Sequence, residues 1–248
     1  MKRPIIAIPI IIFGILLIYL LLSFNAIYYR IGHSNISLLK VESMYNFNEQ
    51  LENEPIKIIA LGDSLTYGQG ADNFSEAYPY LLAKKIAGEK QTVNLAPLAF
   101  PGAMTSDLIN HYLDQAVAFQ PDIATVLIGV NDLHNHVSLL EFKENYQKII
   151  TTLKTNPQSK IYLISLPFIG DNVLMLPPYQ KYFFEETKKY NEIIKTLAKE
   201  NQVEYIDITT ETAELFKKSG NHYSADHFHP SALGYKIFEQ LIYASINQ

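Results

Sequence analysis

Residues 56–68 have the sequence Ile56-Lys57-Ile58-Ile59-Ala60-Leu61-Gly62-Asp63-Ser64-Leu65-Thr66-Tyr67-Gly68, and the rest of the predicted fold is arranged around them. The apolar, β-branched run 56–61 predicts a buried strand that ends at Gly62. A serine just past the carboxyl end of a central strand, flanked by glycines, can hold its hydroxyl in a crevice. Ser64 is therefore a candidate nucleophile. The alternative is a turn in which Asp63 or Ser64 only caps the following helix.

The chain from residue 55 onward alternates short apolar runs with longer helical patterns. We predict further strands over residues 92–96, 123–128, 160–165 and 203–208. We predict helices over residues 77–87, 105–119, 139–153, 180–200 and 231–246. Strands that alternate with helices form right-handed crossovers and a parallel sheet covered on both faces. The predicted fold class is therefore α/β, a three-layer α/β/α sandwich around a central parallel sheet of about five strands.

The composition argues against several functions. The chain of 248 residues carries 20 basic and 25 acidic side chains, a net charge of −5, and has no dense basic run. A nucleic-acid partner is not expected, because binding to phosphates requires a basic patch. Cysteine is absent, which rules out disulfides, thiolate metal sites and a cysteine nucleophile.

The amino-terminal residues predict a membrane anchor. Residues 4–22 contain no charged side chain and follow Lys2 and Arg3. At about 1.5 Å per residue this run can cross a hydrocarbon core of about 30 Å, and the basic start favours the cytoplasmic side. The alternatives are a buried helix and a cleaved signal peptide. Cleavage after Ala26 would place Phe24 at position −3, where a small residue is usual.

The domain organisation follows from this anchor. Residues 26–54 mix tyrosine, asparagine, serine and acidic residues without a clear period, which is typical of a connecting segment. We predict an anchor over residues 1–25, a tether over 26–54 and a catalytic domain over 55–248. The expected location is the cell membrane, with one span and the domain on the extracytoplasmic side. Cleavage of the first segment would instead make the protein secreted.

The residues that follow the predicted strands meet at the edge where a parallel sheet binds ligands. They are Ser64, the segments 97–102, 129–132 and 167–178, and the segment 224–230 before the last helix. A serine hydroxyl needs a base to take its proton, and a third group orients that base. We predict His229 as the base and Asp226, three residues earlier on a helical turn, as the orienting acid. The Ser64 and Gly102 backbone N–H groups and the Asn131 side chain are available to an oxyanion, each contributing about 3 kcal/mol if well placed.

Two other interpretations of these residues remain open. Asn131 and Asp132 could form a helix-capping pair after a strand. A second possibility is a zinc site, since imidazoles and a carboxylate close in sequence suit that metal. Its ligands would be His222, Asp226, His227 and His229. No His-x-x-x-His pair on a helix completes a recognisable zinc site, so we predict no metal.

The sequence resembles the SGNH hydrolases, also called GDSL hydrolases, over nearly all of residues 56–246. The matching blocks are Gly62-Asp63-Ser64-Leu65, residues 94–102, Gly129-Val130-Asn131-Asp132 and Asp226-His227-Phe228-His229. The resemblance implies that Ser64 is the nucleophile and that Gly102 and Asn131 serve the oxyanion hole. It also implies a flavodoxin-like fold and ester hydrolysis without a metal or another cofactor.

The substrate is less constrained by the sequence. Residues 167–179 form a long and apolar connection between a predicted strand and helix, and such loops are often binding lids. We hypothesise that this loop lines an acyl- or lipid-facing groove beside Ser64, the alternative being core packing. The predicted function is a membrane-anchored serine esterase or lipase-like acylhydrolase for small-molecule, lipid or envelope-polymer esters. The alternatives are an O-acetyl esterase for cell-envelope polysaccharide and a catalytically silent binding module.

Overall fold

The computed structural model describes residues 7–32, 39–168, 170, 173–218 and 220–246. Its centre is a sheet of six strands in the order β1-β3-β2-β4-β5-β6. All neighbouring strands pair in parallel except β1, which pairs antiparallel with β3. The strands are β1 (Tyr45–Phe47), β2 (Ile56–Gly62), β3 (Val93–Ala99), β4 (Ile123–Leu127), β5 (Lys160–Ile164) and β6 (Glu204–Ile206).

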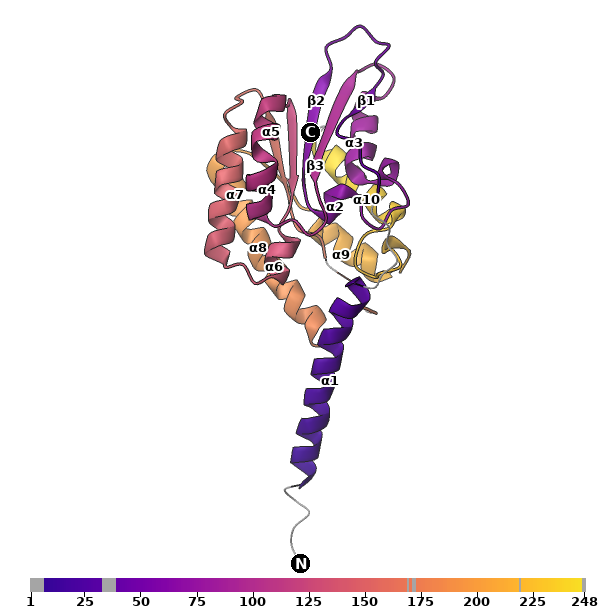
Figure 1. Ribbon diagram of the computed structural model, residues 1–248, viewed down its shortest axis with the longest axis vertical. Helices are drawn as coiled ribbons and strands as arrows, with labels where there is room; N and C mark the ends of the chain where they lie inside the picture. Colours follow the sequence, from indigo (N-terminus) through magenta and orange to yellow (C-terminus); the bar gives the residue numbers. More distant parts are fainter. Residues whose placement is uncertain (1–6, 33–38, 169, 171–172, 219, 247–248) are drawn as a thin grey trace, which may run out of the picture.

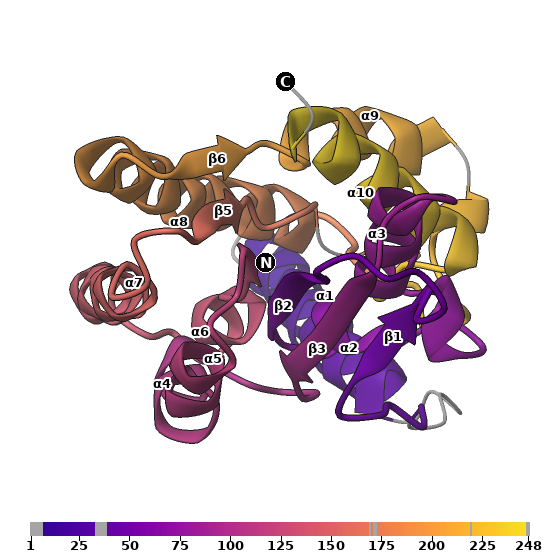
Figure 2. The same ribbon diagram turned by 90° about the horizontal axis from the view of Figure 1, so that it is seen from above.

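Helices cover both faces of this sheet, which confirms the predicted three-layer α/β/α class (Figure 2). One layer contains α3 (Tyr78–Ala87) and α10 (Ala232–Ile246), which pack against each other. The other contains α4 (Thr105–His111), α5 (Leu113–Phe119), α7 (Leu139–Leu153) and α8 (Tyr179–Asn201). Three further helices lie at the carboxyl edge of the sheet (Figure 1): α2 (Ser64–Tyr67), α6 (Val130–His134) and α9 (Thr209–Lys218).

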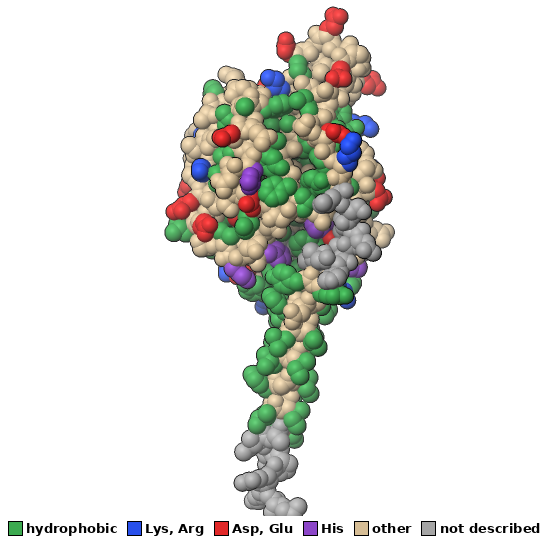
Figure 3. Space-filling view, in the orientation of Figure 1, with side chains coloured by type: hydrophobic (Ala, Val, Ile, Leu, Met, Phe, Trp, Pro, Cys, Tyr) green, Lys and Arg blue, Asp and Glu red, His purple; other side chains and the backbone are tan. Residues whose placement is uncertain are grey.

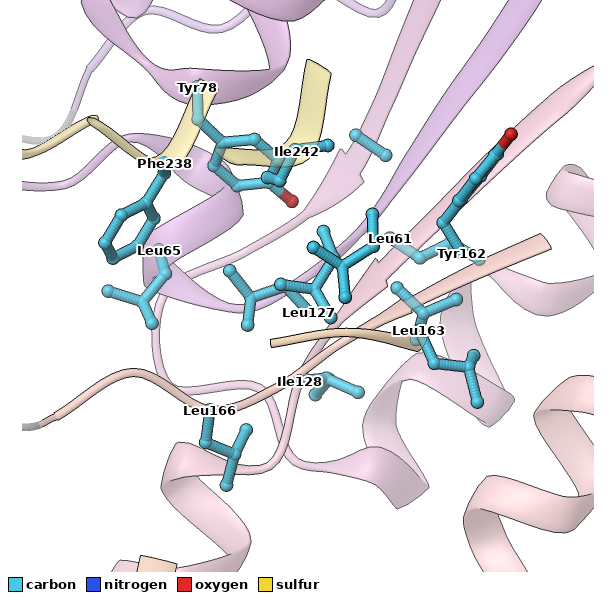
Figure 4. Packing of buried hydrophobic residues seen from close by; sticks show 14 of the residues in the cluster. Leu61, Leu65, Tyr78, Leu127, Ile128, Tyr162, Leu163, Leu166, Phe238 and Ile242 are labelled. Carbon is cyan, nitrogen blue, oxygen red and sulfur yellow. The ribbon is translucent and has the colours of Figure 1, made fainter. Parts of the chain in front are cut away.

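The core lies between these layers because the central strands are apolar on both faces. All five residues of β4 are buried, and β2 is buried from Ile58 to Gly62. Such continuous burial is the pattern of a parallel strand with helices on each side. Figure 4 shows this core at the end of β2, where the Leu65 side chain lies beside the Phe238 ring.

The strand order fixes where a ligand can bind. After β2, the chain moves outward to β3 and then returns across β2 to β4, so the strand order reverses between β2 and β4. In open parallel sheets the crevice outside the carboxyl ends at such a reversal is the usual binding site. The residues that follow β2, β3 and β4 therefore surround one position at the edge of the sheet.

The strand β1 shows which part of the predicted tether, residues 26–54, packs on the domain. Tyr45 pairs with Leu95 of β3, so this segment completes the sheet at one side. Its rings pack on the domain, with Tyr45 stacked at 4.9 Å on Phe74. Three residues are too short for a strand pattern to be recognised in the sequence, and the pairing depends on an edge supplied by a distant part of the chain.

Two helices also differ from the predicted boundaries. The helix predicted over 105–119 is divided into α4 and α5, because Tyr112 leaves helical geometry with φ of −125°. The amino-terminal helix α1 (Ala7–Gly32) runs beyond the predicted anchor boundary at residue 25. Among the described residues, α1 is the one helix long and apolar enough to cross a membrane, over Ile8–Arg30.

Candidate active site

Ser64 is held at the carboxyl end of β2 by a sharp transition from strand to helix. It is the first residue of α2, and Asp63 caps this helix by accepting a hydrogen bond from Leu65 N–H at 2.9 Å. A Cβ atom at Gly62 would clash with the Thr66 side chain and the Leu127 carbonyl, so only glycine fits there. Asp63 therefore caps the helix as the alternative interpretation expects. This cap holds Ser64 in position, so capping by Asp63 is compatible with Ser64 as the candidate nucleophile.

The structure brings Ser64 together with the two residues predicted to activate it. His229 Nε2 lies 3.0 Å from Ser64 Oγ, although 165 residues separate them in the chain. On the other side of the ring, His229 Nδ1 lies 2.5 Å from Asp226 Oδ2. All three residues are buried. A hydroxyl, an imidazole and a carboxylate thus form one continuous hydrogen-bonded row.

The segment that carries Asp226 and His229 is a tight turn and not the helical turn predicted from the sequence. Asp226 Oδ1 accepts three hydrogen bonds at 2.7–2.9 Å, from Ser224 Oγ, Phe228 N–H and His229 N–H. An aspartate that binds backbone N–H groups just ahead of it competes with helix formation. The same carboxylate therefore shapes the turn and orients the imidazole.

These contacts keep the Asp226 carboxylate charged. Burial alone would raise the pKa of Asp226. The hydrogen bond and charge attraction to His229, with the hydrogen bonds from Ser224 and Phe228, outweigh burial and lower the pKa to about 2. A carboxylate that remains ionised at neutral pH stabilises the imidazolium formed when a histidine takes a proton.

The predicted oxyanion donors lie on the two loops that flank Ser64. Gly102 follows β3 with φ of +85°, and Asn131 lies on α6 after β4. One Asn131 Nδ2–H donates to the Ala103 carbonyl at 3.0 Å, which joins the two loops. An amide nitrogen carries two hydrogens, so the second is left for another acceptor. The Ser64 N–H opens α2, where amides have no partner within the helix. The oxyanion role of these three donors stays a prediction.

Asp132 is a structural residue in this arrangement. It is fully buried and accepts hydrogen bonds from both the backbone N–H and the hydroxyl of Thr105 at the start of α4. These bonds tie the loop after β4 to the loop after β3. The capping interpretation of Asn131 and Asp132 is thus correct in part, because Asp132 binds the first N–H of a neighbouring helix.

His134 lies near the candidate site, although a histidine just after Asp132 is more often a solvated loop residue that at most rims the site. Its ring stacks on Phe183 at 4.8 Å and meets Phe228, the neighbour of His229, at 5.7 Å. Burial, followed by the effect of His136, lowers the pKa of His134 to about 4, so the ring is neutral. Two aromatic neighbours brought together by α8 and the loop before α10 explain this environment, and no local sequence pattern reveals them.

The zinc interpretation finds no support in the described residues. No group of three or more histidine, cysteine, aspartate or glutamate side chains is placed to hold a metal ion there. Asp226 and His229 instead direct their polar atoms at each other and at Ser64.

The long connection after β5 has two parts. At its start, Pro167 and Phe168 line a small apolar pocket with Leu65, the residue after Ser64, and Val130, the residue before Asn131. Further along, Leu174 and Met175 are buried in the core.

The remaining exposed part of this connection faces away from that core. Val173 and Leu176 are 49% and 38% exposed, respectively. Positions 169, 171 and 172 lie outside the described residues. Core packing therefore accounts for part of the loop, and the groove beside Ser64 stays a hypothesis.

Asp63 is the other titratable group beside Ser64. Burial raises the pKa of Asp63 to about 7, while the bond from Leu65 N–H lowers it and the Asp132 charge raises it. Its Oδ2 atom has no hydrogen-bond partner within the part of the chain that the structure describes. A buried oxygen in this position favours the protonated, neutral carboxyl.

We expect this group to make stability depend on pH. Between the ordinary value of 3.8 and about 7 the folded chain holds a proton that the unfolded chain has lost, so stability falls as pH rises through this window. Asp63→Asn removes the titration and should flatten that part of the profile. Thermal unfolding of both chains in detergent from pH 4 to 8 measures it. Parallel profiles for the two chains would show that Asp63 is charged in the folded state.

The fold and the grouped serine, histidine and aspartate define a class, that of ester hydrolases built on a three-layer α/β/α sandwich. Within that class, the chain belongs to the GDSL-like lipase/acylhydrolase family, whose model matches residues 60–237. Membership of this family supports hydrolysis of carboxylic esters, as the resemblance implies. No curated protein matches the sequence.

Solved structures of esterases share the fold. A lipase/acylhydrolase from Enterococcus faecalis superposes with a TM-score of 0.62 at 23% identity, covering 77% of this chain and 94% of that one. An acetylxylan esterase from Geobacillus stearothermophilus gives 0.59 at 22% identity, with the same coverage of 77% and 94%. The acetyl xylan esterase AlAXEase gives 0.62 at 20% identity, covering 77% and 100%.

Proposed function

We propose that this protein is a membrane-anchored serine esterase that cleaves carboxylic esters through an acyl-enzyme on Ser64. The observation that carries the proposal is the 3.0 Å contact between Ser64 Oγ and His229 Nε2. It unites a hydroxyl from the start of the domain with an imidazole from its end, at the reversal point of the sheet. Family membership supplies independent support for ester hydrolysis.

In the first half-reaction, Ser64 Oγ attacks the ester carbonyl and its proton passes to His229 Nε2. The negative oxygen of the tetrahedral intermediate is stabilised by the Ser64 and Gly102 N–H groups and the free Asn131 Nδ2–H. The intermediate collapses when His229 gives the proton to the leaving alcohol. Asp226 holds Nδ1–H throughout, so Nε2 is the nitrogen free to accept.

In the second half-reaction, a water molecule enters the position that the alcohol has left. His229 takes a proton from this water, whose oxygen attacks the acyl carbonyl on Ser64. The second tetrahedral intermediate releases the carboxylic acid, and the proton returns from His229 to Ser64 Oγ. No group beyond these residues is needed to balance the protons.

The anchor in this proposal is α1. It contains no charged residue between Arg3 and Arg30, and most of its side chains are exposed. Such a surface is stable in lipid and costly in water. We infer a single span with the domain on the extracytoplasmic side, as the basic start of the chain favours.

A second candidate is an O-acetyl esterase for cell-envelope polysaccharide. Two of the structural neighbours are acetyl xylan esterases by name, which is consistent with this candidate. A third candidate is a binding module that keeps the fold and lacks activity.

A panel of p-nitrophenyl esters with acyl chains of rising length separates these candidates. We expect the full chain in detergent to hydrolyse acetate and butyrate esters and to retain its activity in a chelator. Cleavage of acetate alone would favour the O-acetyl esterase. Loss of activity to the chelator would point to a metal hydrolase. Absence of turnover, with no labelling by a soluble fluorophosphonate, would favour the binding module.

A further inference from the structure

Exposed large apolar side chains of the catalytic domain gather at the end of the sheet where Ser64 lies. Within the described part of the domain, Met44 and Leu215 are also exposed, but they are not counted in this group. The group, called here the apolar rim, consists of Leu139, Leu140, Val173, Leu176, Tyr182 and Leu233. All six come from the first turns of α7, α8 and α10 or from the loop before α8. In a parallel α/β fold the helices run opposite to the strands, so these first turns lie at the carboxyl edge.

The helix α1 leaves the domain at this same end (Figure 1). Figure 3 shows its hydrophobic surface continuing to the base of the domain, whereas several acidic side chains lie at the far end. Three hydrogen bonds of 2.8–2.9 Å join α1 to residues 173–179, the segment that carries Val173 and Leu176 of the rim. Tyr19 Oη donates to the Pro177 carbonyl, Tyr179 Oη to the Leu20 carbonyl and Arg30 Nη1 to the Val173 carbonyl. The part of α1 from Tyr19 to Arg30 therefore lies along the segment that carries part of the rim.

The length of α1 places this contact at the membrane surface. A helix needs about 20 residues to cross the hydrocarbon core. Counted from Pro4, the first uncharged residue after Arg3, this length ends at about Ser23. Tyr19 and Leu20 lie inside that length. Their partners Pro177 and Tyr179 are then at the depth where hydrocarbon meets headgroups, a depth at which tyrosine is enriched.

We propose that the apolar rim rests in the bilayer that α1 crosses, so that the catalytic edge faces the membrane and the ester reaches Ser64 from the bilayer surface. This inference rests on the proposed function. Lipid is the expected occupant because the rim is continuous with the exposed apolar surface of α1, whose neighbours in a membrane are acyl chains. Exposed apolar patches of this kind mark a binding surface, and an apolar surface with aromatic residues suits the bilayer boundary.

A row of rings links the rim to the candidate site. It runs from His229 through Phe228, His134 and Phe183 to Tyr182, with successive ring centroids 4.9, 5.7, 4.8 and 5.3 Å apart. Tyr182 is 45% exposed at the rim, and His229 is buried at the other end of the row. The membrane surface and the imidazole are therefore separated by three rings.

Single tryptophans test how deep the rim lies, because the chain has none of its own. The full chain carrying Leu176→Trp or Tyr182→Trp is reconstituted in vesicles of phosphatidylcholine and phosphatidylglycerol with brominated acyl chains. We expect blue-shifted emission and quenching at least about twofold stronger than for Gln158→Trp, an exposed position at the opposite edge. Equal, weak quenching at all three positions would overturn the proposal. Flotation of the protein with the vesicles tests the anchor separately.

Access to Ser64 from the bilayer is tested with two fluorophosphonates on the wild-type chain. One is water-soluble, and the other is attached to a phospholipid in the same vesicles. We expect both to label Ser64, with the lipid-borne probe at least about tenfold faster when it shares the bilayer than when it is in separate vesicles. Labelling by the soluble probe alone would overturn membrane access. Labelling by neither would overturn the proposed serine chemistry instead.

Discussion

Replacing Ser64 with alanine is expected to lower kcat for p-nitrophenyl butyrate by about 10⁴- to 10⁶-fold. The alanine leaves the oxyanion donors and His229 in place but removes the atom that bonds to the acyl carbon. Loss of the nucleophile in serine hydrolases has effects of this size, and the residual rate reflects binding and charge stabilisation alone. Initial rates of the purified wild-type and Ser64→Ala proteins measure the difference.

The matched control is Ser245→Ala, since Ser245 lies near the end of α10 and its hydroxyl only donates to the Leu241 carbonyl. We expect that variant to keep wild-type rates. Thermal unfolding of both variants checks that the fold is intact. A Ser64→Ala protein that folds normally and retains more than about a tenth of the activity would exclude Ser64 as the nucleophile.

The parts of the fold that the sequence predicts are those fixed by local pattern. The strand over 56–61 has an apolar run interrupted only by Lys57 and bounded by Gly62, and helix α7 over 139–153 has both a capping serine and a clear period. These signals lie within a few residues of the element they specify. The strand and helix boundaries in the structure therefore agree with the prediction to within about two residues at these places.

The residues of the candidate site can be predicted from short motifs and not from the periodicity that predicts strands and helices. Ser64, Asp226 and His229 lie in short motifs whose chemistry is recognisable without coordinates. The motif did not specify the path of the backbone: the turn at Asp226 is set by three hydrogen bonds to one oxygen, which spacing alone cannot distinguish from a helical turn.

Features that depend on contacts between distant segments cannot be predicted from local sequence patterns. The strand β1 needs the edge of β3, His134 needs Phe183 and Phe228, and the contact of α1 with residues 173–179 needs both segments in place. The individual residues in each case are common tyrosines, histidines and leucines. Their role is decided by the tertiary fold, which local propensity does not contain.

Replacing Asp226 with asparagine is expected to lower kcat by about 10⁴-fold while leaving the turn folded. The three donors at Oδ1 fix how the new side chain sits, because the asparagine oxygen must stay where Ser224 Oγ and two backbone N–H groups point. Its NH₂ group then faces His229 Nδ1. That nitrogen must accept, so the ring proton moves to Nε2, which can no longer take the proton of Ser64.

The measurement is kcat for p-nitrophenyl butyrate with Asp114→Asn as the control, since Asp114 is an exposed carboxylate on α5. We expect the control to behave as the wild type, and the Asp226→Asn protein to keep near-normal thermal stability at pH 7. The wild-type carboxylate stabilises the fold above about pH 4, and this contribution fades as pH falls toward 2. The variant should therefore lose less stability than the wild type on acidification. An Asp226→Asn protein with more than about a tenth of the wild-type kcat would mean that the tautomer of His229 is set by another group.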